Sequence, residues 1–285
     1  MIPQANITAW RAAAPWPDDA QVEQDLALTR AVIQLFAEPK LQGKLALRGG
    51  TALHKLFIKP PCRYSEDIDL VQTEPGPIGP ILDAIRENLD PWLGKPKRAS
   101  AEGGVSLVYR FDSEIPPTRP LRLKIEINTR EHFTILGYHA GELTANNPWF
   151  SATTKIATFQ IDELQATKLR ALYQRRKGRD LFDLWLTISR GLLDPQRVIK
   201  CFGEYMDREG HPVSRAQFEE NLQEKQANAA FLEEVKPLLS ADIAYDGTVA
   251  LAQVRDHLIE NLPGDPWRGV TPAASKKPRP HRNKP

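Results

Sequence analysis

The chain has little cysteine, no long apolar run and no histidine cluster, and each absence argues against a class of protein. Its 285 residues include two cysteines, Cys62 and Cys201, which are too few for a disulfide framework and favour a reducing compartment such as the cytoplasm. No stretch of about 18 apolar residues occurs, so we expect no transmembrane helix and no membrane partner. The six histidines form no H-x-x-x-H pattern, which argues against a zinc site.

Positive charge is concentrated at the end of the chain. Gly264–Pro285 carry six Lys or Arg and one Asp, so the net charge of +2 leaves a body of −3 beside a tail of +5. Any nucleic-acid contact of the body must therefore use a local basic patch. The Pro-rich segment 264–285 is expected to be a disordered basic tail.

Hydrophobic periodicity predicts an α+β fold in which a mixed sheet precedes an all-helical part. We expect an extended segment over 1–18, a sheet-containing domain over 19–158 and a helical domain over 159–263. The apolar spacing predicts strands over 44–48, 65–72, 105–112, 121–129 and 132–139, with helices over 19–38, 51–57 and 78–89 between them. It predicts further helices over 161–176, 180–191, 195–206, 215–235 and 247–262.

Two acidic strands carry the strongest chemical pattern. Alternate side chains of a strand share a face, so in "SEDIDLVQ" Asp67 and Asp69 lie together, with their backbones roughly 6–7 Å apart. In "LRLKIEIN" the same alternation places Glu126 on a polar face, and it would become a third carboxylate if the two strands are neighbours. Such carboxylates suit Mg²⁺ (or Mn²⁺), which takes oxygen ligands and retains substrate phosphates. Each motif alone is more typical of an ordinary half-exposed strand than of a metal site.

A glycine pair precedes these strands. Gly49 and Gly50 follow a predicted strand and precede a predicted helix, where bare backbone lets a phosphate approach the N–H groups. No G-x-x-x-x-G-K-[ST] or G-x-G-x-x-G sequence occurs, which excludes a Walker loop and a dinucleotide fingerprint. A Gly-Gly pair is usually just a turn, so its order and spacing relative to the aspartates carry the interpretation.

The segments "LRGGTALHKLF", "RYSEDIDL", "KIEIN" and "KLRALYQRRKGRDLFDL" resemble the nucleotidyl transferase AbiEii/AbiGii toxin family, within the DNA-polymerase-beta-like nucleotidyltransferases. The resemblance covers about 44–185. It implies a nucleotidyltransferase domain and a metal-dependent toxin of a toxin–antitoxin or phage-defence pair. Such a toxin transfers NMP from an NTP to an acceptor, expected to be the 3′ end of tRNA, and so blocks translation. The implied partners are the NTP, tRNA and a cognate antitoxin protein.

The resemblance also assigns residues. It implies metal binding by Asp67, Asp69 and Glu126, with Lys168 and Asp180 completing the catalytic set. The residues expected to contact the nucleotide are Arg48, Gly49, Gly50, Thr51, Ser65 and Lys168. We expect Arg63 to offset phosphate charge, and Asp183 to cap a helix or pair with a local arginine.

The basic run Arg175, Arg176, Lys177 and Arg179 has two interpretations. It could bind the phosphates of an RNA acceptor, or it could be the solvated end of a helix. Two other functions also stay open. The domain could bind a nucleotide or dock a partner without catalysis, or it could be a metal-dependent RNase that needs no NTP.

Overall fold

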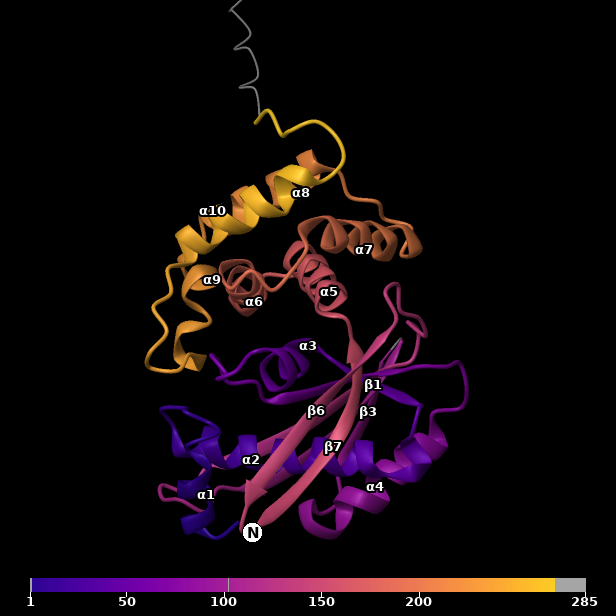
Figure 1. The fold of residues 1–285 in the computed structure, drawn as a ribbon, viewed down its shortest axis with the longest axis vertical. Helices are drawn as coiled ribbons and strands as arrows, with labels where there is room; N and C mark the ends of the chain where they lie inside the picture. The colour runs from indigo at the N-terminus through magenta and orange to yellow at the C-terminus, as the bar shows by residue number, and fades with distance from the viewer. Residues whose placement is uncertain (1, 102, 270–285) are drawn as a thin grey trace, which may run out of the picture.

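A mixed seven-stranded sheet followed by a group of helices forms the structure, a computed structural model that describes residues 2–101 and 103–269 (Figure 1). The strand order is β3-β4-β5-β2-β1-β7-β6. The pairs β1–β7 and β2–β5 are parallel, and the other neighbours are antiparallel. The strands are β1 (Leu45–Arg48), β2 (Asp67–Gln72), β3 (Lys97–Ala101), β4 (Gly104–Asp112), β5 (Pro120–Asn128), β6 (Tyr138–Asn147) and β7 (Phe150–Phe159).

The helices divide into two groups along the chain. Those that accompany the sheet are α1 (Gln4–Trp10), α2 (Asp19–Ala37), α3 (Gly49–Ala52) and α4 (Gly79–Leu93). Those that follow it are α5 (Ile161–Gln174), α6 (Gly178–Ser189), α7 (Pro195–Arg208), α8 (Arg215–Gln226), α9 (Ala229–Glu233) and α10 (Gly247–His257). In Figure 1 the second group lies above the sheet, whereas α2 and α4 lie at its lower side. The α+β fold predicted from the sequence is confirmed.

Alternation along the strands separates the core from the site. Ile68 and Leu70 of β2 are buried, and Asp67 and Asp69 lie half-buried on the opposite face. The same pattern runs along β5, where Leu123, Ile125 and Ile127 join the core. Helix α2 covers this apolar face, because its own buried side chains belong to the same cluster. The polar face is thereby left for the second group of helices.

The N-terminal segment is not extended over 1–18 as expected, because residues Gln4–Trp10 form α1. Its position depends on the buried carboxylate of Asp25 in α2. The indole N–H of Trp10 donates to Asp25 Oδ1 at 2.8 Å, and that of Trp16 donates to Oδ2 at 3.2 Å. Lys55 Nζ lies 2.6 Å from the same carboxylate. The segment is thus held both by the burial of Ile2, Ile7, Trp10, Ala14 and Trp16 in the core and by these tertiary hydrogen bonds, which local periodicity cannot show.

Three further local predictions differ from the structure. The strand predicted over 132–139 is wrong up to Gly137, because the carboxylate of Glu163 accepts the N–H groups of Ile135 and Leu136 in place of a strand partner. The helix predicted over 215–235 is two helices, with Asn228 capping α9. Strands β3 and β7 and most of β6 were not predicted.

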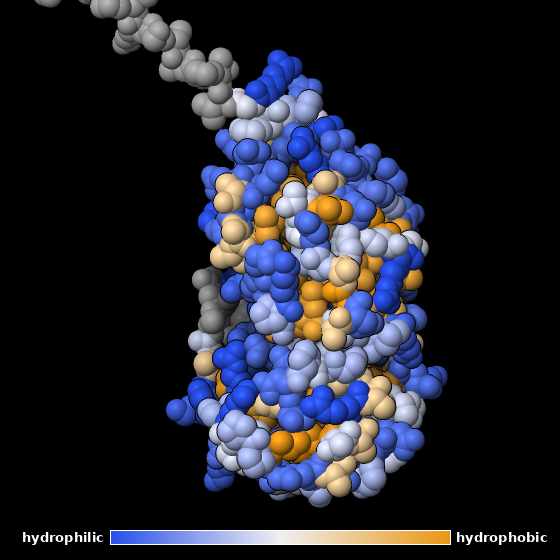
Figure 2. Space-filling model, turned by 90° about the vertical axis from the view of Figure 1, so that its left-hand side faces the viewer, coloured by the Kyte–Doolittle hydropathy of each residue, from blue (hydrophilic) through white to orange (hydrophobic). Residues whose placement is uncertain are grey.

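The sheet ends at Phe159 and α5 begins at Ile161, beside the domain boundary expected between 158 and 159. Of the expected tail, 264–269 contain no helix or strand, and 270–285 lie outside the described residues. Within the part of the chain that the structure describes, every helix is too short or too polar to cross a membrane. Figure 2 shows a mainly hydrophilic face with apolar residues set among polar ones.

Replacing Asp25 tests the attachment of the N-terminal segment. Asp25→Ala would leave two indole N–H groups and the Lys55 ammonium without their acceptor, so we expect unfolding free energy to fall by about 3–5 kcal/mol. Chemical denaturation measures this change. Asp83→Ala, at an exposed position of α4, is the control and should change stability little. Equal stability of both variants would show that Asp25 does not hold the segment.

Candidate active site

Strand pairing brings the acidic residues together. In the parallel pair β2–β5, Asp69 lies opposite Glu126 and Asp67 lies opposite Lys124. In the antiparallel pair β1–β2, Arg48 lies opposite Asp69, so the glycine turn that follows β1 begins beside this aspartate. The two acidic strands are therefore neighbours, which is the condition under which the sequence places Glu126 beside the aspartates.

The glycines are required by close packing against these side chains. Gly49 has φ +76°, and a Cβ built on it would overlap the Asp69 carboxylate. A Cβ on Gly50 would overlap the Arg63 guanidinium and would lie 3.0 Å from Ser65 Oγ. Any larger residue at Gly49 would have to displace the aspartate. The pair thus lets the backbone turn directly against the carboxylates.

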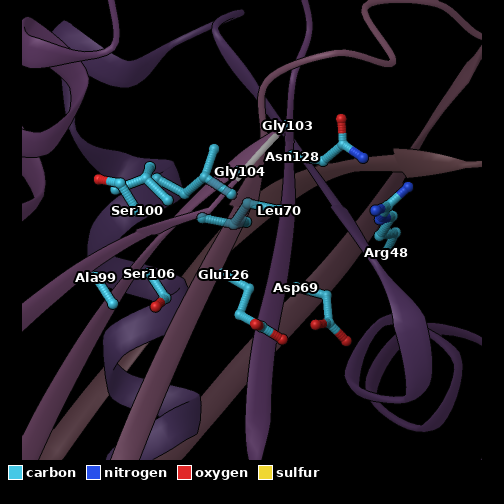
Figure 3. Close-up of a pocket in the computed structure, with 12 residues that line it drawn as sticks. Arg48, Asp69, Leu70, Ala99, Ser100, Gly103, Gly104, Ser106, Glu126 and Asn128 are labelled. Atoms are coloured by element: carbon cyan, nitrogen blue, oxygen red, sulfur yellow. The ribbon is translucent and has the colours of Figure 1, made fainter.

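Asp69 and Glu126 line two cavities and are shared between them. The first, which we call the interdomain cavity, has a volume of about 320 Å³ and lies between the sheet and helices α5 and α6. It is rich in cations and contains Gly50, Arg63, Ser65, Asp67, Arg122, Lys124, Lys168, Arg175 and Arg179. The second, the strand-edge cavity, has a volume of about 290 Å³ and is shown in Figure 3. Arg48, Ser100, Gly104, Ser106 and Asn128 contribute to it.

The aspartates are held in an environment that disfavours negative charge. Burial raises the pKa of Asp67 to about 6, and the neighbouring Asp69 charge adds to the effect. Burial also raises the pKa of Asp69, against the opposing charges of Arg48 and Lys168. Asp67 Oδ1 is buried and has no hydrogen-bond partner among the described residues. A buried, unpartnered carboxylate oxygen beside a second carboxylate fits a divalent cation, which would supply the missing charge.

Glu126 does not complete a three-carboxylate group. Across the described residues 2–101 and 103–269, no set of three or more His, Cys, Asp or Glu side chains is placed to hold a metal ion. The Glu126 carboxylate instead pairs with Lys124 Nζ at 2.7 Å. Two aspartates remain as candidate metal ligands, which suffices for Mg²⁺ because it is commonly bound by one or two carboxylates plus substrate phosphates.

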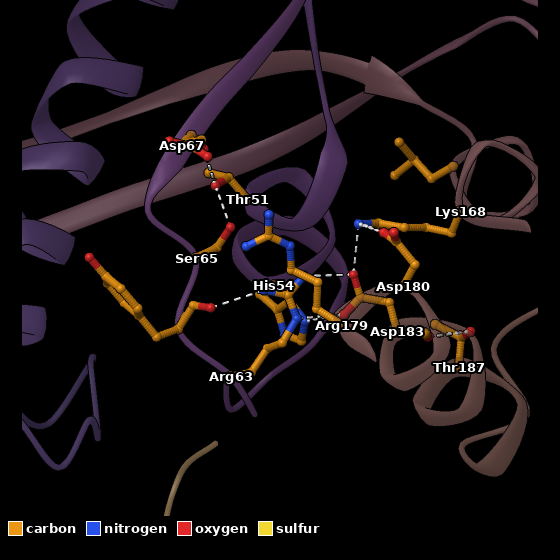
Figure 4. A network of polar contacts seen from close by, with 12 residues as sticks. Thr51, His54, Arg63, Ser65, Asp67, Lys168, Arg179, Asp180, Asp183 and Thr187 are labelled. Atoms are coloured by element: carbon orange, nitrogen blue, oxygen red, sulfur yellow. Dashed lines mark hydrogen bonds and ion pairs between the residues drawn. The ribbon is translucent and has the colours of Figure 1, made fainter. Parts of the chain in front are cut away.

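A buried charge network lies beside the interdomain cavity, which two of its members, Arg63 and Lys168, line (Figure 4). Lys168 Nζ of α5 lies 3.2 Å from Asp180 and 3.0 Å from Asp183, both on α6. Arg63 forms two hydrogen bonds of 2.7 Å with the Asp183 carboxylate. His54 Nε2 lies 3.0 Å from the same carboxylate. The network therefore joins the segments around α3 and β2 to α5 and α6.

The pKa shifts follow from this pairing. Burial alone would raise the pKa of Asp183, but the Arg63 and Lys168 cations hold it well below its usual range. Burial would also raise the pKa of Asp180, but the cations Lys168 and Arg175 lower it below its usual value. Both aspartates are fully buried and ionised, so Lys168 is fixed between two anions.

Comparison with known proteins settles the family. The sequence profile described as nucleotidyl transferase AbiEii toxin, type IV toxin–antitoxin system, matches residues 30–255. The chain belongs to the AbiEii toxin family. It is a nucleotidyltransferase toxin of a type IV toxin–antitoxin system.

A solved structure shares the fold at low sequence identity. MenT4, a nucleotidyltransferase toxin from Mycobacterium tuberculosis H37Rv, has a TM-score of 0.60 and 16% identity, covering 92% of this chain and 91% of its own. A nucleotidyltransferase from H. pylori has a TM-score of 0.49 and 16% identity, covering 83% of this chain and 92% of its own. No curated protein matches the chain in sequence.

Several AbiEii-type motif residues do not face the interdomain cavity. Thr51 is fully buried, and its hydroxyl donates to the backbone oxygen of Asp67 at 2.5 Å. Arg48 lies in the strand-edge cavity and donates to Glu131 at 2.5 Å. Asp180 is enclosed by Lys168 and Arg175. These residues position their neighbours, whereas Gly50, Ser65 and Lys168 reach the cavity itself.

Two residues of the basic run face the interdomain cavity, and the other two pair with acidic residues elsewhere. Arg175 and Arg179 line the interdomain cavity, and Arg175 also bonds Asp180 at 2.7 Å. Arg176 instead pairs with Glu224 at 3.5 Å, and Lys177 pairs with Glu234 at 3.8 Å. The four residues do not form one continuous RNA surface.

Two functional groupings were missed by sequence reasoning. Asp183 pairs with Arg63, 120 positions away, and not with a local arginine, so Arg63 is committed to a buried ion pair. Glu131 joins Arg48 to Arg170 of α5, which donates to it at 2.7 Å. No local pattern signals either pair. The alternation along β5 predicted that Arg122 and Lys124 lie on its polar face. It gave no reason to assign these two residues to a cavity.

Gly49→Ala tests the packing of the glycine turn against Asp69. We expect nucleotidyl transfer to fall on the order of 100-fold, because the added Cβ displaces a site carboxylate. Gly43→Ala is a matched control, since Gly43 has φ +71° but nothing within 4 Å of its Cβ position. Both variants should lose about 1 kcal/mol of stability from backbone strain. Equal activities of the two variants would contradict the assignment.

His54 predicts a pH dependence of stability. Burial, with the nearby Arg63 charge, lowers its pKa from 6.5 to about 4. Between these values the unfolded state binds more protons, so stability should fall as pH falls, by on the order of 3 kcal/mol across the window. His54→Gln keeps an N–H donor for Asp183 but does not titrate. Its thermal unfolding midpoint should therefore depend less on pH from 6.5 to 4 than that of the wild type, and parallel curves would argue against this role.

Proposed function

We propose that the toxin transfers a nucleoside monophosphate from an NTP to the 3′ hydroxyl of an RNA and releases pyrophosphate. The acceptor is tRNA, and the reaction needs Mg²⁺ or Mn²⁺. The observation that carries the proposal is the position of Asp69 and Glu126 between two cavities. Transfer between two substrates requires a place for each on opposite sides of the reacting phosphorus. The arrangement supports such a reaction better than a site built for one ligand.

The interdomain cavity suits the NTP. Its walls bring Lys168, Arg122, Lys124, Arg175 and Arg179 toward one space, and such cations offset triphosphate charge. Ser65 adds a hydroxyl, and the bare Gly50 backbone allows close approach. Because the described contacts include no side-chain ion pair for Arg179, its guanidinium is the cation most available to a phosphate.

Asp67 and Asp69 would hold the metal. Their raised pKa values and the unpartnered Asp67 Oδ1 support this role, since a bound cation would relieve both penalties. When bound, Mg²⁺ supplies positive charge that stabilises the transferring phosphoryl group. Glu126 faces both cavities, so we assign it the orientation and deprotonation of the acceptor hydroxyl.

The family supports the following proposed biological setting. A toxin of this type is neutralised by a cognate antitoxin, and transfer to the 3′ end of tRNA would prevent aminoacylation and so stop translation. Such arrest would serve phage defence. We assign the reaction to the cytoplasm, because its proposed substrates, NTP and tRNA, are found there.

The test is label transfer from each of the four NTPs to purified tRNA, with wild type and two variants. Asp69→Asn should lower transfer by roughly 100-fold or more, because it removes a charge that holds the metal. Asp83→Asn, exposed on α4, should match the wild type. EDTA should abolish transfer, and added Mg²⁺ or Mn²⁺ should restore it.

Other outcomes would identify the competing functions. No label transfer with any NTP would reject the proposal. Degradation of RNA without NTP would indicate a nuclease that uses the same carboxylates. Nucleotide binding that is unchanged in Asp69→Asn, in the absence of any transfer, would indicate a binding module.

A further inference from the structure

A third cavity extends the site away from the carboxylates. It has a volume of about 510 Å³ and shares Gly103 and Asn128 with the strand-edge cavity. We call it the loop–helix cavity, because the loop after β5 and the helices α5 and α7 enclose it. Its lining includes Arg130, Glu131, Phe133, Arg170, Tyr205, Arg208, Glu209 and His211. The three cavities thus follow one another, with Asp69 and Glu126 between the first and the second.

The in-line geometry of phosphoryl transfer indicates which substrate occupies the strand-edge and loop–helix cavities. The attacking oxygen and the leaving oxygen lie roughly in line on opposite sides of the phosphorus. If the triphosphate occupies the cation-rich interdomain cavity, the acceptor hydroxyl must approach from the strand-edge cavity. The chain that carries this hydroxyl then continues into the loop–helix cavity. This step rests on the proposed function.

The loop–helix cavity offers flat surfaces and positive charge. The Arg208 guanidinium lies 4.0 Å from the centroid of the Phe133 ring, and that of Arg170 lies 4.7 Å from the Tyr205 ring. The two rings are 5.2 Å apart. Aromatic rings and arginine planes are the groups on which unpaired bases stack.

The acids of this cavity are already neutralised within the protein. Arg170 donates to Glu131 at 2.7 Å and to Glu209 at 2.8 Å. Arg48 and Gln174 donate to the same two carboxylates. Arg208, by contrast, is 52% exposed, and the carboxylate of Glu204, with which it pairs, is 3.9 Å away. A phosphate of a bound chain would meet this cation with little competition.

We propose that the loop–helix cavity binds the unpaired nucleotides just before the acceptor hydroxyl of an RNA, by stacking on the Phe133–Arg208 pair and by a phosphate contact to Arg208. A base-paired end does not suit the site, because its bases are already stacked on one another and cannot insert singly between the loop and α7. The site therefore selects RNA with a single-stranded 3′ end.

The test measures binding of a fluorescently labelled, unstructured RNA oligonucleotide with a free 3′ hydroxyl. Arg208→Ala and Phe133→Leu should each weaken binding roughly 5- to 150-fold, the range found for loss of base stacking. Arg208→Ala should also reduce the slope of log affinity against log salt by about 0.7, because one phosphate contact is lost. Arg86→Ala on α4, with a side chain 45% exposed, is the matched control and should bind as the wild type does.

Measurements of transfer activity distinguish a failure of this inference from a failure of the proposed function. In Arg208→Ala the KM for the RNA acceptor should rise, with the KM for NTP unchanged. Wild-type affinity and salt slope in both variants would overturn the inference, even if transfer to RNA occurs. Tighter binding of a blunt duplex, or labelling of a protein in place of RNA, would also overturn it. Failure of all label transfer despite Arg208-dependent RNA binding would reject the proposed reaction and leave the RNA site standing.

Discussion

The buried carboxylate of Asp183 is the contact on which the shape of the site depends. It is fully buried and is bonded by Arg63, His54 and Lys168, which come from three separate segments. Losing one partner of a buried ion pair typically costs about 3–5 kcal/mol, since the other charge stays buried. This carboxylate therefore fixes α6 against the sheet half of the chain. The interdomain cavity exists because these elements meet at a set distance.

The same network fixes the position of the Lys168 ammonium at the interdomain cavity. An isolated lysine could swing away from the site, but Asp180 and Asp183 hold its ammonium from two sides. Their negative charge also limits how strongly Lys168 alone can attract an anion. The exposed cations Arg122 and Arg175 and the half-buried Arg179 then provide the remaining positive charge of the cavity. The buried Lys168 is thus held in a fixed position, whereas the more accessible arginines supply most of the attraction for an anion.

How much of this could be predicted depended on whether a feature was local. The alternation in β2 and β5 predicted which face Asp67, Asp69 and Glu126 share, because strand geometry dictates it. The helix α1 depends on indole bonds to Asp25, and the Arg63–Asp183 pair spans 120 positions, so neither leaves a local pattern. The 132–139 segment has strand-like composition, but Glu163 takes up its N–H groups. Tertiary hydrogen bonds decided each of these cases.

The two-sided position of Asp69 explains why the glycine turn, and not a longer loop, follows β1. Arg48 leaves the strand toward the strand-edge cavity, whereas Gly50 lines the interdomain cavity two residues later. Between them Gly49 adopts φ +76° directly against the Asp69 carboxylate. A side chain there would separate the backbone from the carboxylate that both cavities share. In the proposed reaction, the glycine therefore keeps the two cavities within reach of one reacting phosphorus, which a single-step transfer requires.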